Sequence, residues 1–167
     1  MLGNLPRPNY KSIVVCDKQT VKDISGLIVY GIKTSVPQAE KIKKYFKGRN
    51  DYETCENIWN YLKDKVKYVA EPSNLQSVKT LSRLLLSDKQ GDCKHLTTAA
   101  ASLCLALGFN VKLRLVGFNH FTKELKHIYC IAEKNGRQYI IDVVMNQYDH
   151  EPAYKFKKDI NLKKNKL

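Results

Sequence analysis

The sequence predicts an α+β fold in which a long helix packs on an antiparallel sheet, and three features of the chain indicate it. Apolar residues recur at helical spacing over residues 51–69 and again over residues 94–107, as they do in amphipathic helices. Asn135-Gly136 lies between two apolar runs, which is the strongest short signal for a β-hairpin. With 167 residues, the chain is long enough for one domain with a hydrophobic core.

The N-terminal part of the chain gives a less definite pattern. Two apolar runs, residues 12–15 and 27–32, each predict either a strand or an arm that packs on another part of the protein. Pro37 predicts the start of a helix that continues through Phe46, because proline is well suited to the first turn of a helix.

A helix is predicted next, with Asp51 as its cap and its end at about Val69. Residues 71–92 predict irregular chain with one helical turn at residues 81–86. The apolar side chains of the helix fall on one stripe, which indicates that this face is buried. They are Cys55, Ile58, Trp59, Leu62 and Val66.

Cys93 is predicted to lie at the start of a long helix. It directly precedes residues 94–107, and Gly108 stands where glycine commonly ends a helix. The free N–H groups and the dipole at a helix N-terminus favour negative charge, so they favour a thiolate at Cys93. Cys104 lies further along the same helix and has no such advantage.

Three strands are predicted after this helix. The first covers residues 111–117 and leads into a polar loop, residues 118–126. The second and third, residues 127–133 and 137–144, flank the Asn-Gly turn. We therefore expect the last two strands to form an antiparallel hairpin.

The register of this hairpin brings two ionisable residues together. A two-residue turn pairs Lys134 with Arg137, and His127 and Asp142 then become diagonal neighbours on one face, about 7–8 Å apart by backbone. A bulge would change this register. Asp142 lies in an apolar run, where a buried carboxylate needs a partner such as an imidazole N–H. The alternative is an aspartate that faces water at the end of the strand.

Together these residues predict cysteine-based catalysis. Cys93 would supply the thiolate, His127 would accept and return its proton, and Asp142 would orient the imidazole. The backbone N–H of Cys93 would stabilise an oxyanion. A second donor is expected upstream, and the candidates are Gln90 and Gln76.

Metal binding is the rival use of cysteine and histidine. Cys93 and His95 lie close together, but the sequence has no second ligand pair at zinc spacing, so neither a metal nor another cofactor is predicted. His95 shares a helix with Cys93, while His120 lies in the polar loop and His150 near the C-terminus, and all three are weaker candidates. The five cysteines include no C-x-x-C pair, which indicates a reducing, cytoplasmic compartment.

The net charge of +13 is concentrated at the two ends of the chain. Residues 1–50 carry 10 basic and 3 acidic residues, residues 51–154 carry 13 and 12, and residues 155–167 carry 6 and 1. We expect a basic N-terminal extension, packed on the core or on a partner, then the core itself, then a basic C-terminal tail. Removing residues 157–167 should therefore leave the fold intact. Basic flanks bind nucleic acid, an acidic membrane surface or an acidic protein, or keep a chain in solution. No apolar run approaches the ~20 residues of a membrane-spanning helix, and the start of the chain has no apolar leader.

Four motifs, in their order and spacing, resemble the transglutaminase-like superfamily over about residues 51–160. The resemblance implies a papain-like α+β fold in which the cysteine helix packs on an antiparallel sheet. It also implies the catalytic residues Cys93, His127 and Asp142. The motifs are Val66-Lys-Tyr-Val69, Gly91-Asp-Cys93 with the helix end at Leu107-Gly108, His127-Ile-Tyr129, and Tyr139-Ile-Ile-Asp142.

The sequence most resembles small members of this superfamily encoded by tailed bacteriophages, at residues 80–84 and 151–156. It differs from many relatives at Lys94, where they have an acidic residue, and at Tyr139, where they have tryptophan, so the substrate stays open. Family members include proteases, amidases, transamidating enzymes and inactive binding proteins. Two hypotheses follow. The chain is a hydrolase or acyltransferase that acts on peptide or amide bonds, or it is a structural or binding protein, such as a virion component, that attaches to virion proteins or another acidic partner through its basic flanks.

Overall fold

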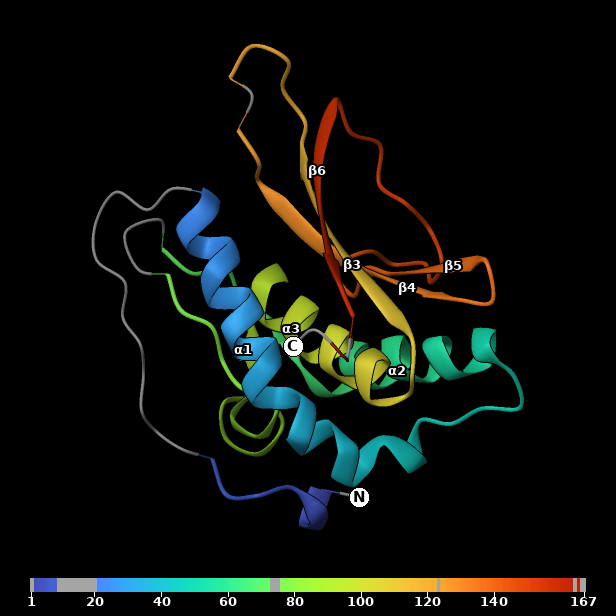
Figure 1. Ribbon diagram of the computed structural model, residues 1–167. Coiled ribbons are helices and arrows are strands. Elements are labelled where there is room, and N and C mark those ends of the chain that lie inside the picture. The colour runs from blue at the N-terminus through green and yellow to red at the C-terminus, as the bar shows by residue number, and fades with distance from the viewer. Residues whose placement is uncertain (1, 9–20, 73–75, 123, 164, 166–167) are drawn as a thin grey trace.

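The computed structural model describes residues 2–8, 21–72, 76–122, 124–163 and 165, so the run at residues 12–15 lies outside it. In the described part, helices cover one face of an antiparallel sheet (Figure 1). The elements are η1 (Leu2–Asn4), α1 (Val21–Ile42), η2 (Lys43–Tyr45), α2 (Asp51–Lys65), β1 (Lys67–Tyr68), η3 (Arg83–Asp88), β2 (Gln90–Gly91), α3 (Cys93–Ala106), β3 (Asn110–Gly117), β4 (His127–Lys134), β5 (Arg137–Ile141) and β6 (Phe156–Leu162). The main sheet has the strand order β5-β4-β3-β6, and β1 and β2 form a separate parallel pair. Among the described helices, none is both long enough and apolar enough to cross a bilayer.

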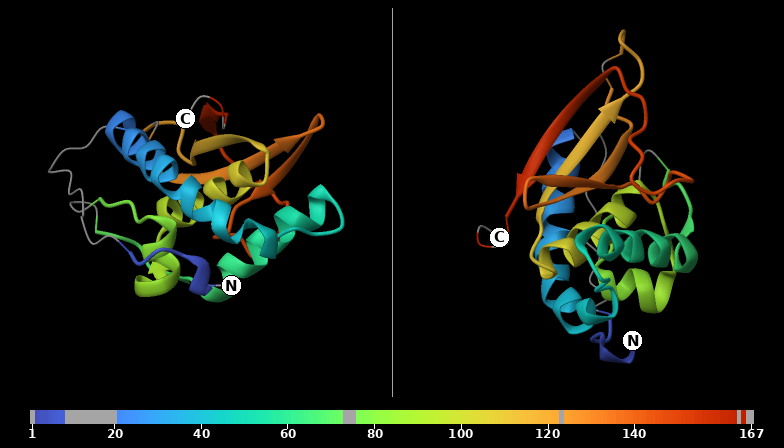
Figure 2. Two further views of the ribbon diagram at one scale, coloured as in Figure 1. Left: turned by 60° about the horizontal axis from the view of Figure 1, so that its bottom comes forward. Right: turned by 90° about the vertical axis from the view of Figure 1, so that its right-hand side faces the viewer.

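Helix α3 lies at the centre of the core. It packs against α1 on one side and against β3 and β4 on the other (Figure 2). Residues 94–106 are all buried, which explains why the helix is apolar or small nearly all round. The predicted α+β fold, with the cysteine helix packed on an antiparallel sheet, is confirmed.

Helix α1 differs from the prediction for the N-terminal part of the chain. It is continuous and buries Ile28 and Ile32 completely, so the run at residues 27–32 is helical and not a strand. Pro37 lies inside α1 and not at its start. The proline is exposed, so the carbonyl that loses its N–H donor can bond to water, which limits the cost of the interruption.

Helix α2 has a different cap and an earlier end than predicted. The cap is Asn50, and not Asp51, because the side chain of Asn50 accepts the N–H of Glu53 at 2.9 Å. Val66 is already extended, and the chain continues into β1 instead of remaining helical to Val69. This change of direction brings β1 beside β2, directly before Cys93.

The hairpin formed by β4 and β5 has the predicted register. Lys134 pairs with Arg137 across Asn135 and Gly136. The two turn residues have φ values of 53° and 76°, as a two-residue Asn-Gly turn requires. Strand β5 ends one residue before Asp142, which therefore follows the sheet directly.

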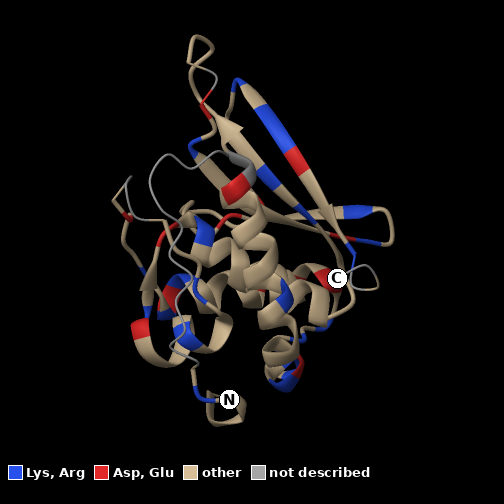
Figure 3. Ribbon diagram, turned by 60° about the vertical axis from the view of Figure 1, so that its left-hand side comes forward, with Lys and Arg blue, Asp and Glu red and all other residues tan. Residues whose placement is uncertain are grey.

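The C-terminal part of the chain is not a separate tail. Strand β6 pairs with β3 along its whole length, so the prediction of a tail is wrong for residues 156–162. Arg114 on β3 donates two hydrogen bonds of 2.8 Å to Asp159 on β6, and Leu162 is buried. Figure 3 shows basic residues on β6 with an acidic residue beside them. Lys157 and Lys158 are exposed. Because of these lysines the strand has the basic composition of a solvated tail, which explains the wrong prediction.

Candidate active site

A cleft of about 580 Å³ opens at the N-terminal end of α3 and contains Cys93 and His127. Its polar wall comes from Tyr68 of β1, from Ala70, Glu71 and Gln76, and from the first turn of α3. Its apolar wall comes from α1, β3, β4 and the chain before β4. The apolar side chains are Ile24, Ile28, Leu115, Leu125 and Ile128.

Cys93 is the first residue of α3, as predicted, and the cap of this helix leaves its backbone N–H available. The side chain of Asp92 accepts the N–H of Lys94 at 3.0 Å. The N–H of Asp92 is donated to Nδ1 of His95 at 3.1 Å, and the N–H of Leu96 to the Asp92 carbonyl at 3.1 Å. Among the residues that the structure describes, none accepts the N–H of Cys93, so this donor of the first turn is open to a ligand.

His95 has a structural role in this cap. Its ring is fully buried, and Nδ1 accepts a backbone N–H. A Cβ added at Gly91 would lie 2.7 Å from Cβ of His95 and 2.9 Å from its Cγ. Glycine at this position therefore allows the ring to fold back over the start of α3. The spacing of Asp92 and His95 is that of a capping box with histidine at the third helical position, a signal that the sequence analysis did not use.

His127 and Asp142 are in direct contact. Nε2 of His127 lies 2.6 Å from Oδ2 of Asp142, which leaves Nδ1 as the ring nitrogen available to Cys93. Burial lowers the pKa of His127, but hydrogen bonds to Asp142 and to the Cys93 side chain, and the negative charges of these groups, raise it to about 9 overall. The structure thus brings together the three residues that the sequence singles out.

Two further hydrogen bonds, one to the backbone of Asp142 and one to its carboxylate, hold this residue in place. Its backbone carbonyl accepts the indole N–H of Trp59 on α2 at 2.8 Å, and its Oδ1 accepts the N–H of Val144 at 3.1 Å. Asp142 is only 2% exposed, so the alternative that it faces water is wrong. Trp59 was expected only as a core residue, and its link to Asp142 spans 83 positions of the sequence.

A network of buried charges supports the polar wall of the cleft. Lys94 is 7% exposed, and its ammonium pairs with Asp92 and, at 3.5 Å, with Glu71. Glu71 in turn accepts the N–H of Ser77 at 2.9 Å and its hydroxyl at 2.5 Å. Burial raises the pKa of Asp92, but His95 and Lys94 outweigh this and lower it to about 2. The network ties the residues before the helix to its first turn.

The same network contains the one grouping of side chains in the described residues that could hold a metal ion. Donor atoms of Glu71, Asp92 and His95 all lie within 4.8 Å of one another. However, the ammonium of Lys94 already pairs with both carboxylates. The negative charge of the group is therefore offset by a residue of the chain itself.

The structure separates the two glutamines that were expected near the oxyanion. Gln76 lines the cleft, and its amide makes only a long 3.4 Å hydrogen bond to the carbonyl of Pro72. Gln90 is not part of the lining; its residue is paired with Lys67 in the β1–β2 pair and its side chain is exposed.

Tyr68 is a residue of the cleft that sequence analysis missed. Pairing of β1 with β2 places it opposite Gly91, two positions before the nucleophile, and it lines the cleft beside Cys93. Burial raises the pKa of Tyr68, and the negative charges of Cys93, Asp92 and Asp142 raise it further. Its hydroxyl therefore stays protonated at neutral pH. Only its place in the Val66–Val69 motif pointed to it.

The remaining cysteines and histidines lie away from the cleft. Burial, with contacts to Cys130 and Cys55, raises the pKa of Cys104 well above its usual range, which makes it unreactive. The four described cysteines are free, and Cys16 lies outside the described residues. His120 and His150 are exposed.

Comparison with known protein families agrees with the fold. The model of the transglutaminase-like superfamily matches residues 40–150, a range that contains Cys93, His127 and Asp142. The chain is similar to a proposed cysteine protease from Cytophaga hutchinsonii, at 19% identity and a TM-score of 0.49, over 78% of this chain and 48% of that one. It is also similar to a TGase, at 17% identity and a TM-score of 0.40, over 84% of this chain and 37% of that one.

The chain therefore spans less than half the length of these two structures. The search of curated proteins found no significant match. None of these findings bears on the resemblance to bacteriophage proteins, which stays a prediction.

Proposed function

Because this chain belongs to the transglutaminase-like superfamily, we propose that it is a cysteine-dependent hydrolase or acyltransferase that acts on peptide or amide bonds. Cys93 is the nucleophile, His127 the acid and base, and Asp142 the residue that orients the imidazole. The supporting observation is that His127 contacts Asp142 at 2.6 Å and lines the same cleft as Cys93, whose side chain helps to raise the pKa of His127. Nucleophilic acyl transfer needs these three parts in this order.

The reaction follows from this arrangement. The thiol of Cys93 gives its proton to Nδ1 of His127, and the sulfur attacks the carbonyl carbon of the substrate. With a pKa of about 9, His127 keeps that proton at neutral pH and can deliver it to the departing amine, which leaves a thioester on Cys93. Water or a second amine then attacks the thioester, gives a proton to His127 and releases the thiol.

The oxyanion of the tetrahedral intermediate needs two donors. The open N–H of Cys93 is the first. We assign the second to the hydroxyl of Tyr68, which lines the cleft and stays protonated. Gln76, whose amide is only weakly held, is the alternative donor.

The walls of the cleft suggest which substrates would fit. The charged groups of the polar wall are paired among themselves, as Lys94 is with Asp92 and Glu71. The opposite wall offers apolar side chains from α1 and β3, such as Ile24 and Leu115. We therefore expect the acyl group to carry an apolar side chain, which this wall would remove from water.

Two finer predictions belong to this proposal. The first is that the protein is encoded by a tailed bacteriophage, carried by the resemblance at residues 80–84 and 151–156, and that it acts in the cytoplasm or in the virion. The second is the rival, non-enzymatic role of a binding protein attached through basic surfaces. An observation that favours attachment is the run at residues 41–49, where five cations and no acidic residue occur.

An activated ester and an alkylating agent together test the chemistry. p-Nitrophenyl acetate reacts through a tetrahedral intermediate, whereas iodoacetamide reacts by direct displacement and develops no oxyanion. We expect the ester to acylate Cys93, as located by mass spectrometry, and Cys93→Ala to remove the burst of nitrophenol. Tyr68→Phe should slow acylation about tenfold to a hundredfold, since one oxyanion donor is lost, and leave alkylation by iodoacetamide unchanged.

Tyr45→Phe is the matched control, because Tyr45 is exposed and lies outside the cleft. If the ester does not acylate Cys93 and all thiols alkylate at equal rates, the enzymatic proposal is wrong and the binding role stands. If Cys93 is acylated but Tyr68→Phe reacts at the wild-type rate, Tyr68 is not the donor, and Gln76→Ala becomes the variant to measure.

A further inference from the structure

A second cavity, of about 430 Å³, lies at the end of α3 opposite to the candidate active site. Ala106 and Leu107, at the C-terminal end of α3, form part of its lining. Helix α3 has 14 residues, so Cys93 and this cavity lie about 20 Å apart along the helix axis at 1.5 Å per residue. A ligand bound here would leave the cleft open.

The lining of this cavity is strongly basic. Lys43, Lys44, Lys47 and Arg49 come from the chain between α1 and α2, and Lys134 comes from the β4–β5 hairpin. The fold thus gathers cations from two segments that are far apart in the sequence. We call this set of five residues the basic pocket.

Ion pairs within the protein account for only part of this charge. Lys43 pairs with Glu40 at 2.7 Å, Arg49 with Glu53 at 3.0 Å, and Lys134 with Asp51 at 2.8 Å.

Two lysines of the basic pocket remain. Within the described ranges, neither Lys44 nor Lys47 has an acidic partner, and both are exposed. These two positive charges repel each other, and an anion bound between them would relieve that repulsion.

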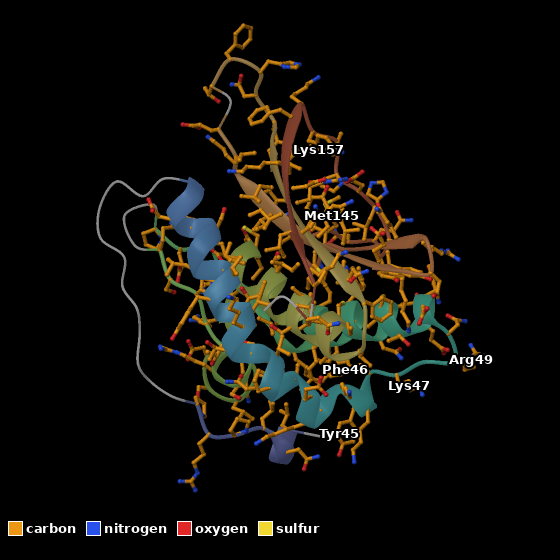
Figure 4. All side chains as sticks on the ribbon, in the orientation of Figure 1. Tyr45, Phe46, Lys47, Arg49, Met145 and Lys157 are labelled. Carbon is orange, nitrogen blue, oxygen red and sulfur yellow. The ribbon has the colours of Figure 1, made fainter. Side chains whose placement is uncertain are left out.

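An exposed aromatic ring lies beside one of these cations, next to the cavity and outside its lining. Tyr45 is 45% exposed and directly follows Lys44, whose ammonium lies 5.2 Å from the centre of the ring. Figure 4 shows Tyr45, Lys47 and Arg49 along one edge of the molecule. Cations interleaved with an exposed aromatic ring suit a single-stranded nucleic acid, because phosphates pair with the cations and a base stacks on the ring.

We propose that the basic pocket binds the phosphate backbone of a single-stranded nucleic acid, with Tyr45 as the stacking platform for a base. An acidic protein segment would meet the cations equally well but would not use the exposed ring. This binding does not depend on the chemistry proposed for Cys93, since the two sites lie at opposite ends of α3.

The test uses the full chain and a fluorescein-labelled oligothymidylate in a salt titration. For single strands the logarithm of the binding constant falls with the logarithm of salt by about 0.7 per phosphate neutralised. The double variant Lys44→Gln/Lys47→Gln should bind more weakly and lower this slope by about 1.4. Tyr45→Ser should weaken binding about tenfold and leave the slope unchanged. Alkylation of Cys93 should be normal in both.

The matched control is Lys157→Gln/Lys158→Gln, which removes the same charge from β6, away from the basic pocket (Figure 4). This control variant should show the same dependence of the binding constant on salt as the wild type. Equal losses in the two double variants would mean that the net charge alone binds the oligonucleotide, and no detectable wild-type binding would also overturn the proposal. If polyglutamate binds as tightly as the oligonucleotide at the same salt and Tyr45→Ser has no effect, the ligand is an acidic protein and the assignment to nucleic acid is wrong.

Discussion

The contact between His127 and Asp142 should make the stability of the protein depend on pH above neutrality. In the folded chain burial lowers the pKa of His127, while hydrogen bonds to Asp142 and Cys93 raise it, to about 9 in all. In an unfolded chain the pKa of histidine is about 6.5. Between these pH values the folded state keeps a proton that the unfolded state has released, so the free energy of unfolding falls as the pH rises.

The size of the effect follows from the same two values. The difference between about 9 and about 6.5 corresponds to about 3 kcal/mol, at about 1.4 kcal/mol for each pH unit. This stabilisation is fully present below pH ~6.5 and is lost as the pH rises through ~9. His127→Gln cannot bind the proton, so the loss of stability over this range should be about 3 kcal/mol smaller in that variant than in the wild type. Asp142→Asn should show an intermediate dependence, because the main partner of the imidazolium is then uncharged.

Urea unfolding at a series of pH values measures these free energies directly. The chain has one tryptophan, Trp59, and its indole donates to the carbonyl of Asp142, so its fluorescence reports on this part of the core. Groups that titrate over the same range without contacting His127 contribute equally to the wild type and to His127→Gln, and they cancel in the difference. Identical pH dependence in the wild type and in His127→Gln would refute the reasoning.

Two further pairs of variants test the packing of Gly91 beside the site and the need for β6. Gly91→Ala should destabilise the protein by about 1–3 kcal/mol and slow the alkylation of Cys93, because the added Cβ would meet His95 at 2.7 Å. Gly26→Ala, where an added Cβ meets nothing within 4 Å, should be neutral or stabilising in thermal melts, and equal losses in the two would contradict the role given to Gly91. A chain that ends at residue 155 should lose its cooperative thermal transition, since β6 is removed, whereas one that ends at residue 163 should keep it; an unchanged transition in the shorter chain would show that β6 is dispensable.

The parts of the fold that depend on local signals could be predicted. The Asn135-Gly136 turn fixes the hairpin register by its own conformation, and this register is what places His127 and Asp142 side by side. The start of α3 was likewise clear, because Gly91 and Gly108 bracket an apolar run.

Other parts could not be read from local signals. The link from Trp59 to Asp142 joins α2 to the end of β5, and nothing near either residue in the sequence indicates it. The place of Tyr68 in the cleft depends on a pairing of β1 with β2 that is only two residues long. Helix α1 was missed because Pro37 is usually read as a start, although an exposed proline is tolerated within a helix that packs well elsewhere.

Strand β6 has a consequence for how copies of the protein behave toward one another. It stands at one end of the sheet, where a strand offers unpaired N–H and C=O groups to any other strand that approaches. Its exposed lysines, Lys157 and Lys158, would be brought against their own counterparts if two copies met edge to edge, and repulsion would oppose that encounter. The neighbouring strand, β3, is almost entirely buried. If β3 stood at the edge in place of β6, its apolar residues would favour pairing with strands of other copies. We therefore expect part of the excess positive charge to oppose the assembly of copies into continuous sheets, whatever partner the protein binds.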